Sequence, residues 1–500
     1  MGNVYKTPTN PPTDMRRAIR HRSFVLPSLI VLFLAGGCAS MEGVAPKSTP
    51  RDAAAVAAER ALAGAPTNAP WPREDWWKAL NDPQLDALMD QALGSSPTLN
   101  IAAARTRQAL AAAQAARASL APRVDASASS VRERFSEHGL VPPPLGGSTQ
   151  TLSELQATLA WEIDFWGRNR ETYEAALGMA RAADVDAYAA RLALSSNIAQ
   201  TYVQLQRTYR QRDVADATLE EREQILALTR DRNAAGLDSR LEVKQAESAI
   251  PATREQIAAL NERIGLLQNA LSALLGAGPD RGAAIARPTT MALTQIALPS
   301  TLPAELIGRR PDIAAARWRI EATSHEIASA KAEFYPNVNL VAFIGLQSLG
   351  ASNLLSAASR VAGAGPAVTL PIFDAGRLRA NLAGRDAEYD IAVEQYNQMV
   401  ADAMRDVVDQ LVSARSVDEQ RIELRAAIGT AQEAYDLALL RYREGLGNYV
   451  QVLSAEQPLL FQRSLEADLD ARALEIDINL VRALGGGFES PLPVADLRAR

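Results

Sequence analysis

Apolar and polar residues alternate with a period of two in four segments of the chain, a pattern typical of β-strands with one apolar face. The longest such row consists of Leu155, Ala157, Leu159, Trp161, Ile163 and Phe165. Comparable rows cover 338–346 and 362–372, although Pro366 and Pro371 weaken the latter, and the weakest row covers 124–128. Because turn-rich stretches separate the members of each pair, the sequence predicts two pairs of strands.

Elsewhere the apolar positions recur at helical spacing, in steps of three and four. Small residues form one such seam, which consists of Ala176, Ala180, Ala183, Ala187, Ala190 and Leu194. No proline lies between Arg168 and Arg232, so this segment predicts a helix roughly 95 Å long. It breaks at Gly236, as a second long helix does at Gly445, and each returns as another helix. Shorter helices are expected to begin at Pro97 and Pro311 and to stop at Pro122 and Pro336.

These elements occur twice in the same order, which indicates an internal duplication. Pro97 and Pro122 match Pro311 and Pro336 at an offset of 214, whereas Gly236 matches Gly445 at an offset of 209. The offset changes by five residues between 124 and 167, which predicts a loop of variable length in that segment. We therefore divide the chain into a signal peptide (1–37), an N-terminal linker (38–76), a first repeat (77–276), an inter-repeat linker (277–303), a second repeat (304–485) and a C-terminal tail (486–500).

The amino terminus resembles a bacterial lipoprotein signal. Four arginines precede an apolar stretch, 24–35, which is too short to span a bilayer, and the stretch ends in Leu34-Ala-Gly-Gly-Cys38. Cys38 is the only cysteine, and the resemblance implies a covalent lipid on its thiol after removal of 1–37. Ala39, rather than Asp, follows the cysteine, which by the same resemblance implies transfer to an outer membrane. The start of the chain is either Met1 or Met15.

Composition removes several other classes of protein. The mean hydropathy of −0.11 excludes a polytopic helical membrane protein. A net charge of −6 argues against a nucleic-acid partner. One cysteine and three scattered histidines build no metal cage, and no catalytic constellation emerges, so we expect neither an enzyme nor a cofactor other than the lipid on Cys38.

Four strands are too few to close a barrel, since small barrels need about eight. An open sheet edge is unfavourable in a bilayer, and a tilted strand of about eleven residues is long enough to cross one. We therefore expect several subunits to complete one barrel, with eight strands from a dimer or twelve from a trimer. Side chains fill an eight-stranded barrel, so a conduit favours twelve strands.

Five motifs together resemble the TolC-type outer-membrane efflux proteins, and within them the NodT-like lipoprotein branch. They are Trp161-Glu-Ile-Asp-Phe-Trp-Gly-Arg168, Gly308-Arg-Arg-Pro-Asp-Ile313, Ala332-Glu-Phe-Tyr-Pro-Asn337, Leu370-Pro-Ile-Phe-Asp-Ala-Gly-Arg377 and Tyr442-Arg-Glu-Gly-Leu446. The resemblance implies a mainly α-helical, duplicated protomer that trimerises into a twelve-stranded β-barrel with an α-helical periplasmic barrel. It also implies the exit duct of a tripartite efflux pump, which passively conducts small molecules from an inner-membrane resistance–nodulation–division (RND) pump through a periplasmic adaptor.

The same resemblance assigns roles to residues of the helix-breaking turns. Gly236, Leu237, Gly445 and Leu446 match the periplasmic tip where adaptor hairpins dock, although both glycines also fit ordinary helix C-caps. Tyr442 matches a tyrosine that helps hold the tip closed. The positions of the family's acidic ring are Gln451 and Ser454 here, so a charge-based gate is either weaker or moved to Glu456.

Two alternatives to the efflux duct stay open from the sequence. A non-conducting, lipid-anchored periplasmic coiled-coil scaffold would explain Cys38 and the helical seams but not the four alternating segments. A duct for protein secretion would share the whole architecture. The exported substrate is not encoded in any motif of this chain.

Overall fold

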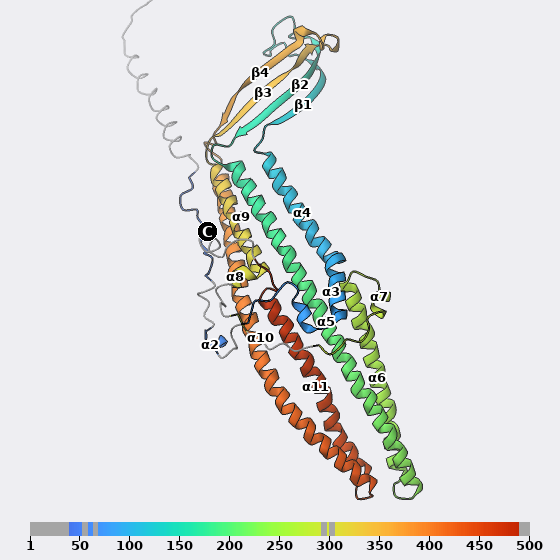
Figure 1. Cartoon of the computed structure of the whole chain (residues 1–500). Coiled ribbons are helices and arrows are strands. Elements are labelled where there is room, and N and C mark those ends of the chain that lie inside the picture. The colour runs from blue at the N-terminus through green and yellow to red at the C-terminus, as the bar shows by residue number, and fades with distance from the viewer. Residues whose placement is uncertain (1–39, 53–58, 64–68, 292–297, 300–305, 490–500) are drawn as a thin grey trace, which may run out of the picture. The chain divides into compact units, whose positions relative to one another are not determined.

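The computed structural model describes residues 40–52, 59–63, 69–291, 298–299 and 306–489 (Figure 1). They form two compact units, each assembled from three stretches of chain. The described residues of the sheet unit lie within 40–47, 112–176 and 322–390, and those of the helical unit lie within 48–111, 177–321 and 391–489. Each unit therefore contains parts of both repeats.

Four antiparallel strands form one sheet in the order β1-β2-β3-β4. Their bounds are β1 Arg123–Arg134, β2 Thr149–Ile163, β3 Asn337–Leu349 and β4 Arg360–Thr369. The four predicted strands are thus confirmed, with different ends. β2 stops at Ile163 rather than Phe165, because the Phe165 N–H turns back to the Ile163 carbonyl at 2.8 Å. β4 stops at Thr369 rather than 372, ahead of Pro371, which has no N–H to donate to a ladder.

The register of the sheet sorts apolar and polar residues onto opposite faces, as the alternation predicts. Leu159 stands between Val124 and Ala342, and Ala342 pairs in turn with Ala364. The adjacent row, one residue along, is mixed: Asp125 and Thr158 are followed by Phe343 and Gly363, so the opposite face is more polar without being free of apolar residues. In the described chain β1 pairs only with β2 and β4 only with β3, so both edge strands carry unpaired backbone groups.

The helices repeat with matching bounds. α4 (Pro97–Ala118) and α9 (Pro311–Ala332) each have 22 residues, and α5 (Arg168–Ala234) and α10 (Arg377–Arg443) each have 67. α6 (Arg240–Leu274) and α11 (Tyr449–Ala483) each have 35. α4 and α9 end four residues before Pro122 and Pro336, respectively. This is consistent with the conformational restriction that proline places on the residue before it. The duplicated, mainly helical fold is confirmed.

A buried hydrogen-bonded cluster joins α3 (Pro83–Ser95) to α5. Leu85, Leu88 and Met89 of α3 are fully buried against the apolar face of α5. The Asp82 carboxylate caps α3 by accepting from the Leu85 N–H at 3.0 Å, and the Tyr202 hydroxyl of α5 donates to the same carboxylate at 3.0 Å. This cluster fixes the N-terminal segment against the helical unit.

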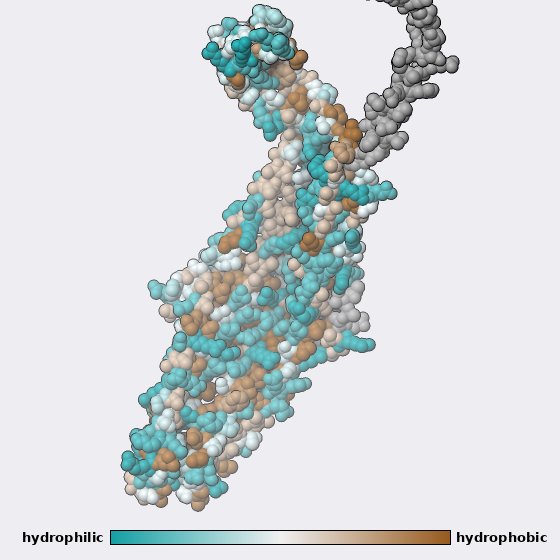
Figure 2. Space-filling view, turned by 180° about the vertical axis from the view of Figure 1, so that it is seen from behind, coloured by the Kyte–Doolittle hydropathy of each residue, from teal (hydrophilic) through white to brown (hydrophobic). Residues whose placement is uncertain are grey.

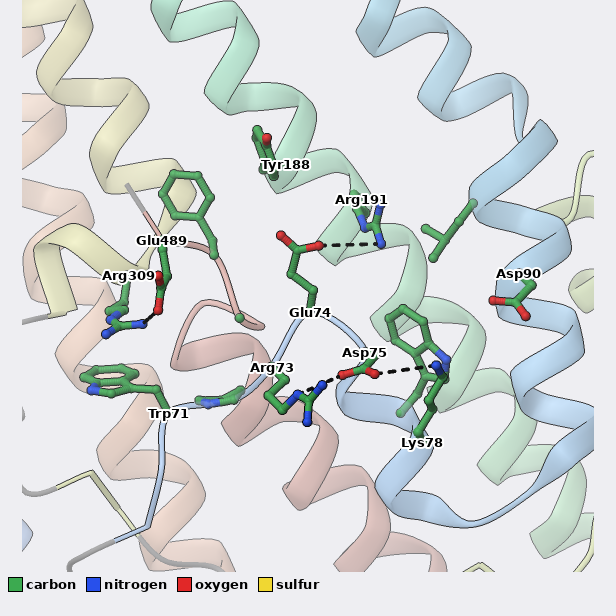
Figure 3. Close-up of a pocket in the computed structure, with 15 residues that line it drawn as sticks. Trp71, Arg73, Glu74, Asp75, Lys78, Asp90, Tyr188, Arg191, Arg309 and Glu489 are labelled. Carbon is green, nitrogen blue, oxygen red and sulfur yellow. Dashed lines mark hydrogen bonds and ion pairs between the residues drawn. The ribbon is translucent and has the colours of Figure 1, made fainter. Parts of the chain in front are cut away.

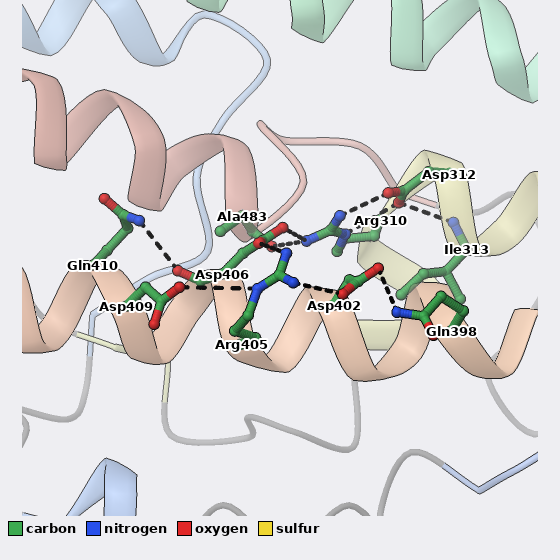
Figure 4. A network of polar contacts seen from close by, with 10 residues as sticks. All are labelled: Arg310, Asp312, Ile313, Gln398, Asp402, Arg405, Asp406, Asp409, Gln410 and Ala483. Carbon is green, nitrogen blue, oxygen red and sulfur yellow. Dashed lines mark hydrogen bonds and ion pairs between the residues drawn. The ribbon is translucent and has the colours of Figure 1, made fainter.

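Arg310 fixes the start of α9 (Figure 4). Its guanidinium pairs with the Asp312 carboxylate at 2.6 Å and with the Asp406 carboxylate of α10 at 3.4 Å. It also donates to the Ala483 carbonyl at the end of α11, at 3.4 Å. Because one side chain joins three helices, the Gly308–Ile313 motif has a structural role.

Residues 40–47 lie along the beginning of α10 in the sheet unit. The Arg379 guanidinium donates to the Ser40 carbonyl at 3.2 Å, and the Lys47 N–H donates to the Asp390 carboxylate at 2.8 Å. Between these contacts, Met41 and Val44 pack on an apolar cluster of α9 and α10. Residues 40–47 therefore lie beside the first turns of α10.

Among the helices that the structure describes, none combines the length and apolar character needed to cross a bilayer.

Candidate functional site

Two turns at the ends of the long helices form the candidate site, which we call the tip. α5 is followed by Gly236 with φ of 72°, and α10 is followed by Gly445 with φ of 75°. The Leu237 N–H bonds the Arg232 carbonyl at 2.9 Å and the Leu446 N–H bonds the Arg441 carbonyl at 2.8 Å, the pattern of a Schellman C-cap. Both glycines are thus helix caps in the left-handed region, where a β-carbon is strained.

The tip also presents apolar side chains to solvent. Leu237 is 65% exposed and Leu446 is 70% exposed, although each directly follows a capping glycine. The next helices begin at once, with Ser239 capping α6 and Asn448 capping α11. Each turn is therefore short and rigidly capped, and carries one projecting leucine.

Tyr442 joins the two turns of the tip. Its side chain is fully buried, and its hydroxyl donates to the Asp238 carboxylate at 2.6 Å. The same hydroxyl lies 2.9 Å from the Thr229 hydroxyl of α5. Because Tyr442 belongs to the second repeat and its partners to the first, this contact ties one helical hairpin to the other.

Arg232 completes this tip network. Its Nε lies 3.0 Å from the Asp238 carboxylate, and its guanidinium carbon lies 4.6 Å from the centre of the Tyr442 ring. The hydrogen bond to Asp238 raises the pKa of Arg232 above its ordinary value. Burial, together with the Asp238 carboxylate, raises the pKa of Tyr442 to about 12, so the hydroxyl keeps its proton at physiological pH. We use "tip network" for Thr229, Arg232, Asp238 and Tyr442.

Glu456 occupies a buried ion pair. Its carboxylate accepts two hydrogen bonds from the Arg222 guanidinium of α5, at 3.1 and 3.0 Å, and its side chain is only 3% exposed. Arg222 also donates to the Thr253 hydroxyl of α6 at 2.8 Å. The charge of Glu456 is thus compensated inside the protomer by Arg222, and the charge-based gate considered for Glu456 stays a prediction.

Gln451 and Ser454 lie on a different face of α11. Both are exposed, three residues apart and therefore adjacent on the helix surface, whereas Glu456 points into the packed side. The exposed face thus carries an amide and a hydroxyl at these two positions and no carboxylate.

Sequence reasoning missed Arg222, Thr229, Arg232 and Asp238 as partners. Arg232 matches Arg441 across the duplication at the offset of 209, but this match does not predict the contact of Arg232 with Asp238. The available signal was a difference between the repeats: Tyr442 aligns with Asn233, and Asp238 aligns with Gly447. Cys38, the predicted lipidation site, lies outside the described residues.

A cavity of about 850 Å³ lies in the helical unit, between the N-terminal segment, α5 and the chain after α11 (Figure 3). Most of its charged side chains form ion pairs: Arg73 and Lys78 contact Asp75, Arg191 contacts Glu74, and Arg309 contacts Glu489, whereas Asp90 also lines the cavity without an ion pair among the described residues. Because the four cationic and four anionic side chains of the lining balance, the cavity has no formal net charge that would select a ligand. In the described part of the chain, no three His, Cys, Asp or Glu side chains gather as metal ligands.

Comparisons with known proteins support the channel assignment. The family model described as outer membrane efflux protein matches residues 88–277 and 302–486. The fusaric acid resistance protein FusA of Burkholderia cepacia is 38% identical over 368 residues, which cover 73% of this chain and 69% of FusA. The multidrug resistance outer membrane protein MdtP of Escherichia coli K12 is 33% identical over 434 residues, covering 84% of this chain and 88% of MdtP. The crystal structure of the outer membrane protein VceC from Vibrio cholerae superimposes with a TM-score of 0.78 and 35% identity, covering 84% of this chain and all of VceC.

Proposed function

This chain belongs to the outer membrane efflux protein family, and from that premise we propose that it is the exit duct of a tripartite pump with an RND transporter and a periplasmic adaptor as partners. The protein is an outer-membrane efflux channel, and its relatives include multidrug and fusaric acid resistance proteins. The observation that carries the proposal is the sheet, which has one apolar face, one more polar face and two open edges.

Three copies of the chain close the barrel in this proposal. The unpaired edges of β1 and β4 are costly in a bilayer unless β1 of one copy pairs with β4 of the next. Three protomers give twelve strands and an open interior, whereas two give eight strands and a filled one. Native mass spectrometry of the detergent-solubilised protein tests this stoichiometry, and a stable monomer or dimer would contradict it.

Conduction separates the duct from a coiled-coil scaffold. Purified protein in a planar bilayer is expected to give discrete single-channel currents, and a membrane-bound protein that gives none would support the scaffold. The resistance functions named for FusA and MdtP favour small molecules over secreted proteins as cargo. Deletion of the gene should therefore sensitise cells to toxic small molecules, with fusaric acid as the first compound to test, and leave protein secretion unchanged.

A lipid on Cys38 anchors the amino terminus in this proposal. Ser40, two residues after Cys38 in the sequence, contacts Arg379 in the first turn of α10, within the unit that contains the four strands, and this contact supports the anchor. Mass spectrometry of the mature amino terminus is expected to show a lipidated Cys38, and an unmodified cysteine would rule the anchor out. A Cys38→Ser variant with its signal peptide retained should still assemble, because a lipid contributes less membrane affinity than the strands.

The adaptor docks on the tip in this proposal, with Leu237 and Leu446 as its apolar contacts. Their exposure on rigid caps is suited to receiving a helical hairpin of another protein. Gly445→Val with Leu446→Asp should abolish efflux-dependent resistance while trimer formation and membrane insertion persist. Ile422→Asp, which changes an exposed apolar residue in the middle of α10, is the matched control. Undiminished resistance in the double variant would mean that these turns are caps alone.

A further inference from the structure

One aromatic side chain lies on the more polar face of the sheet. Phe343 of β3 shares this face with Thr158, its neighbour on β2, and with Gly363, its neighbour on β4. Among the residues of the four strands it is the only aromatic one there, because Trp161 belongs to the apolar face. Phe343 is therefore an exception to the alternation that separates the two faces.

Phe343 lies midway along β3, between Asn337 and Leu349. Figure 2 shows hydrophilic residues gathered at the loop end of the sheet unit, beyond the strands, so the ring stands well inside the part that crosses the membrane. In a barrel closed by three copies the apolar face meets lipid and the interior stays open. The Phe343 ring then faces the interior of the duct.

Two glycines of β4 hold the ring and leave it uncovered. A β-carbon at Gly363 would come within 2.6 Å of the ring carbon Cε1 of Phe343 and within 2.7 Å of Cζ, so one side of the ring rests on the β4 backbone. Gly365, next along the same face, has nothing within 4 Å of an added β-carbon. Phe343 accordingly stays 37% exposed, and Val341 beside it is 36% exposed. The ring is fixed on one side and open on the other.

The charged residues of this face leave an excess of carboxylate. Asp125 and Glu162 are each paired with an arginine, so their charges are compensated. The strands place two further acidic residues on the face, Glu133 and Glu154, and neither forms an ion pair within the part of the chain that the structure describes. The face therefore has a net negative charge, which attracts cations and repels anions.

An open aromatic ring on a negatively charged face suits a planar aromatic cation. Such a molecule can stack on the phenyl ring, and its positive charge is attracted by the negative face of the ring. Glu154 lies four residues from Thr158 along β2, which is about 14 Å, so it acts on the approach of the cation and not by contact at the ring. An aliphatic cation lacks the stacking, and an aromatic anion is repelled by the face.

We propose that Phe343 is a transient binding site for planar aromatic cations inside the barrel, and that Glu154 raises the rate at which they reach it. The inference rests on the proposed barrel, and it adds to the duct a residue that distinguishes one class of cargo from others. It does not need the adaptor or the pump.

Single-channel recording of the purified full chain in a planar bilayer tests the proposal, with ethidium as the planar aromatic cation. The wild-type channel should show brief current blocks when ethidium is added. Phe343→Leu keeps an apolar side chain over Gly363 but removes the ring, and should shorten the mean block by about twofold to tenfold. Phe343→Tyr keeps the ring and should retain the wild-type block duration.

A change at Glu154 separates approach from binding. Glu154→Gln should make the blocks less frequent and leave their duration unchanged, because steering by charge acts on the association rate. The control is Ile344→Ala, at the neighbouring residue of β3 on the apolar face, which is 68% exposed and should change neither quantity. Native mass spectrometry checks that every variant keeps the wild-type oligomeric mass.

Two further probes make the outcome decisive. Tetraethylammonium, a cation without a ring, and 2-naphthalenesulfonate, an aromatic anion, should give shorter or rarer blocks than ethidium. Equal blocks with all three probes, or an unchanged block duration in Phe343→Leu, would overturn the proposal and leave the duct intact. A protein that carries no current would instead contradict the duct. Fluorescence anisotropy of ethidium with the detergent-solubilised protein then decides, and binding that Phe343→Leu does not weaken would overturn the site.

Discussion

Glu247 and Glu456 occupy the same position in the two repeats, 209 residues apart, yet their surroundings are opposite. Glu247 is 31% exposed and contacts Lys244 at 2.7 Å and Arg230 at 3.0 Å on the surface. Glu456 is buried against Arg222, and the repeat counterparts of Lys244 and Arg230 are leucines in an apolar cluster, Leu453 and Leu439. The duplication has therefore kept the backbone while one copy of the site became a core ion pair that links both hairpins.

The largest effect is expected when the buried ion pair between Glu456 and Arg222 is broken. Glu456→Ala leaves the Arg222 guanidinium buried without its carboxylate, which costs about 3–5 kcal/mol. We expect a large fall in the thermal unfolding midpoint and faster hydrogen exchange in α5 and α11 near the tip. Glu247→Ala, the control at the matching position, should leave both measurements unchanged. Equal losses in the two variants would show that burial does not distinguish the repeats.

Replacing both partners sharpens the same comparison. Arg222→Leu with Glu456→Leu removes the buried charges together, and apolar replacements of such pairs are often neutral or stabilising. The double variant should therefore recover most of the unfolding midpoint that Glu456→Ala loses. Failure to recover it would assign the loss to packing rather than to the unpaired charge.

A smaller effect is expected at the tip network. Tyr442→Phe removes the hydroxyl bound to the buried Asp238 carboxylate, a loss of about 1–3 kcal/mol. The two hairpins should separate more readily, which would appear as higher single-channel conductance in planar bilayers. Tyr435→Phe, at a buried tyrosine of the same cluster, is the control. Unchanged conductance in Tyr442→Phe would show that the Tyr442 hydroxyl does not help to hold the channel closed.

The capping glycines should behave alike, unlike the glutamates. Gly236 and Gly445 have nearly the same φ, and nothing packs closely around the position of an added β-carbon at either. Alanine at either position should therefore cost about 1 kcal/mol, through backbone strain alone. Thermal unfolding of the two variants checks this, and a clear difference between them would reveal a contact specific to one repeat.

The smallest effect concerns pH. The pKa of Tyr442 is raised to about 12, against an ordinary value of about 10, so its protonated hydroxyl contributes stability fully below pH 10 and loses it only as the pH passes 12. Raising the pH from 7 to about 9.5 should leave single-channel conductance unchanged. An increase over this range would place the titrating group outside the tip network.

The sequence predicted the elements of this fold better than their contacts. Period-two alternation identified β2 through Leu159 and Trp161 because one face of the strand meets lipid, and prolines marked the ends of α4 and α9. The C-terminal ends of β2 and β4 were predicted two and three residues too late, because the alternation continues into Phe165 and Ile372 after the ladder has stopped. The alternation also underestimated two strands, since β2 begins six residues before Leu155 and β1 continues six residues beyond 128.

The partners at the candidate site could not be read in the same way. Arg222 and Glu456 are 234 residues apart, and neither local spacing nor the repeat predicts their contact. The resemblance indicated Tyr442 as a residue that holds the tip closed, but it did not indicate Asp238 as its partner. The repeats differ at both positions, so the duplication did not reveal this contact either. Such contacts depend on how two hairpins pack, which a one-dimensional pattern does not contain.

Because the paired helices are equal in length, the two helical hairpins extend equally far and their length can change only together. α5 and α10 match in length, as do α6 and α11, and this equality brings Asp238 and Tyr442 to the same level. Deleting seven residues from α5 alone would displace Asp238 by about 10 Å and break that contact. Deleting seven from all four helices would preserve it and shorten every hairpin by two turns. Evolution can therefore fit such a protein to a deeper or shallower periplasm only by changing all four helices in step.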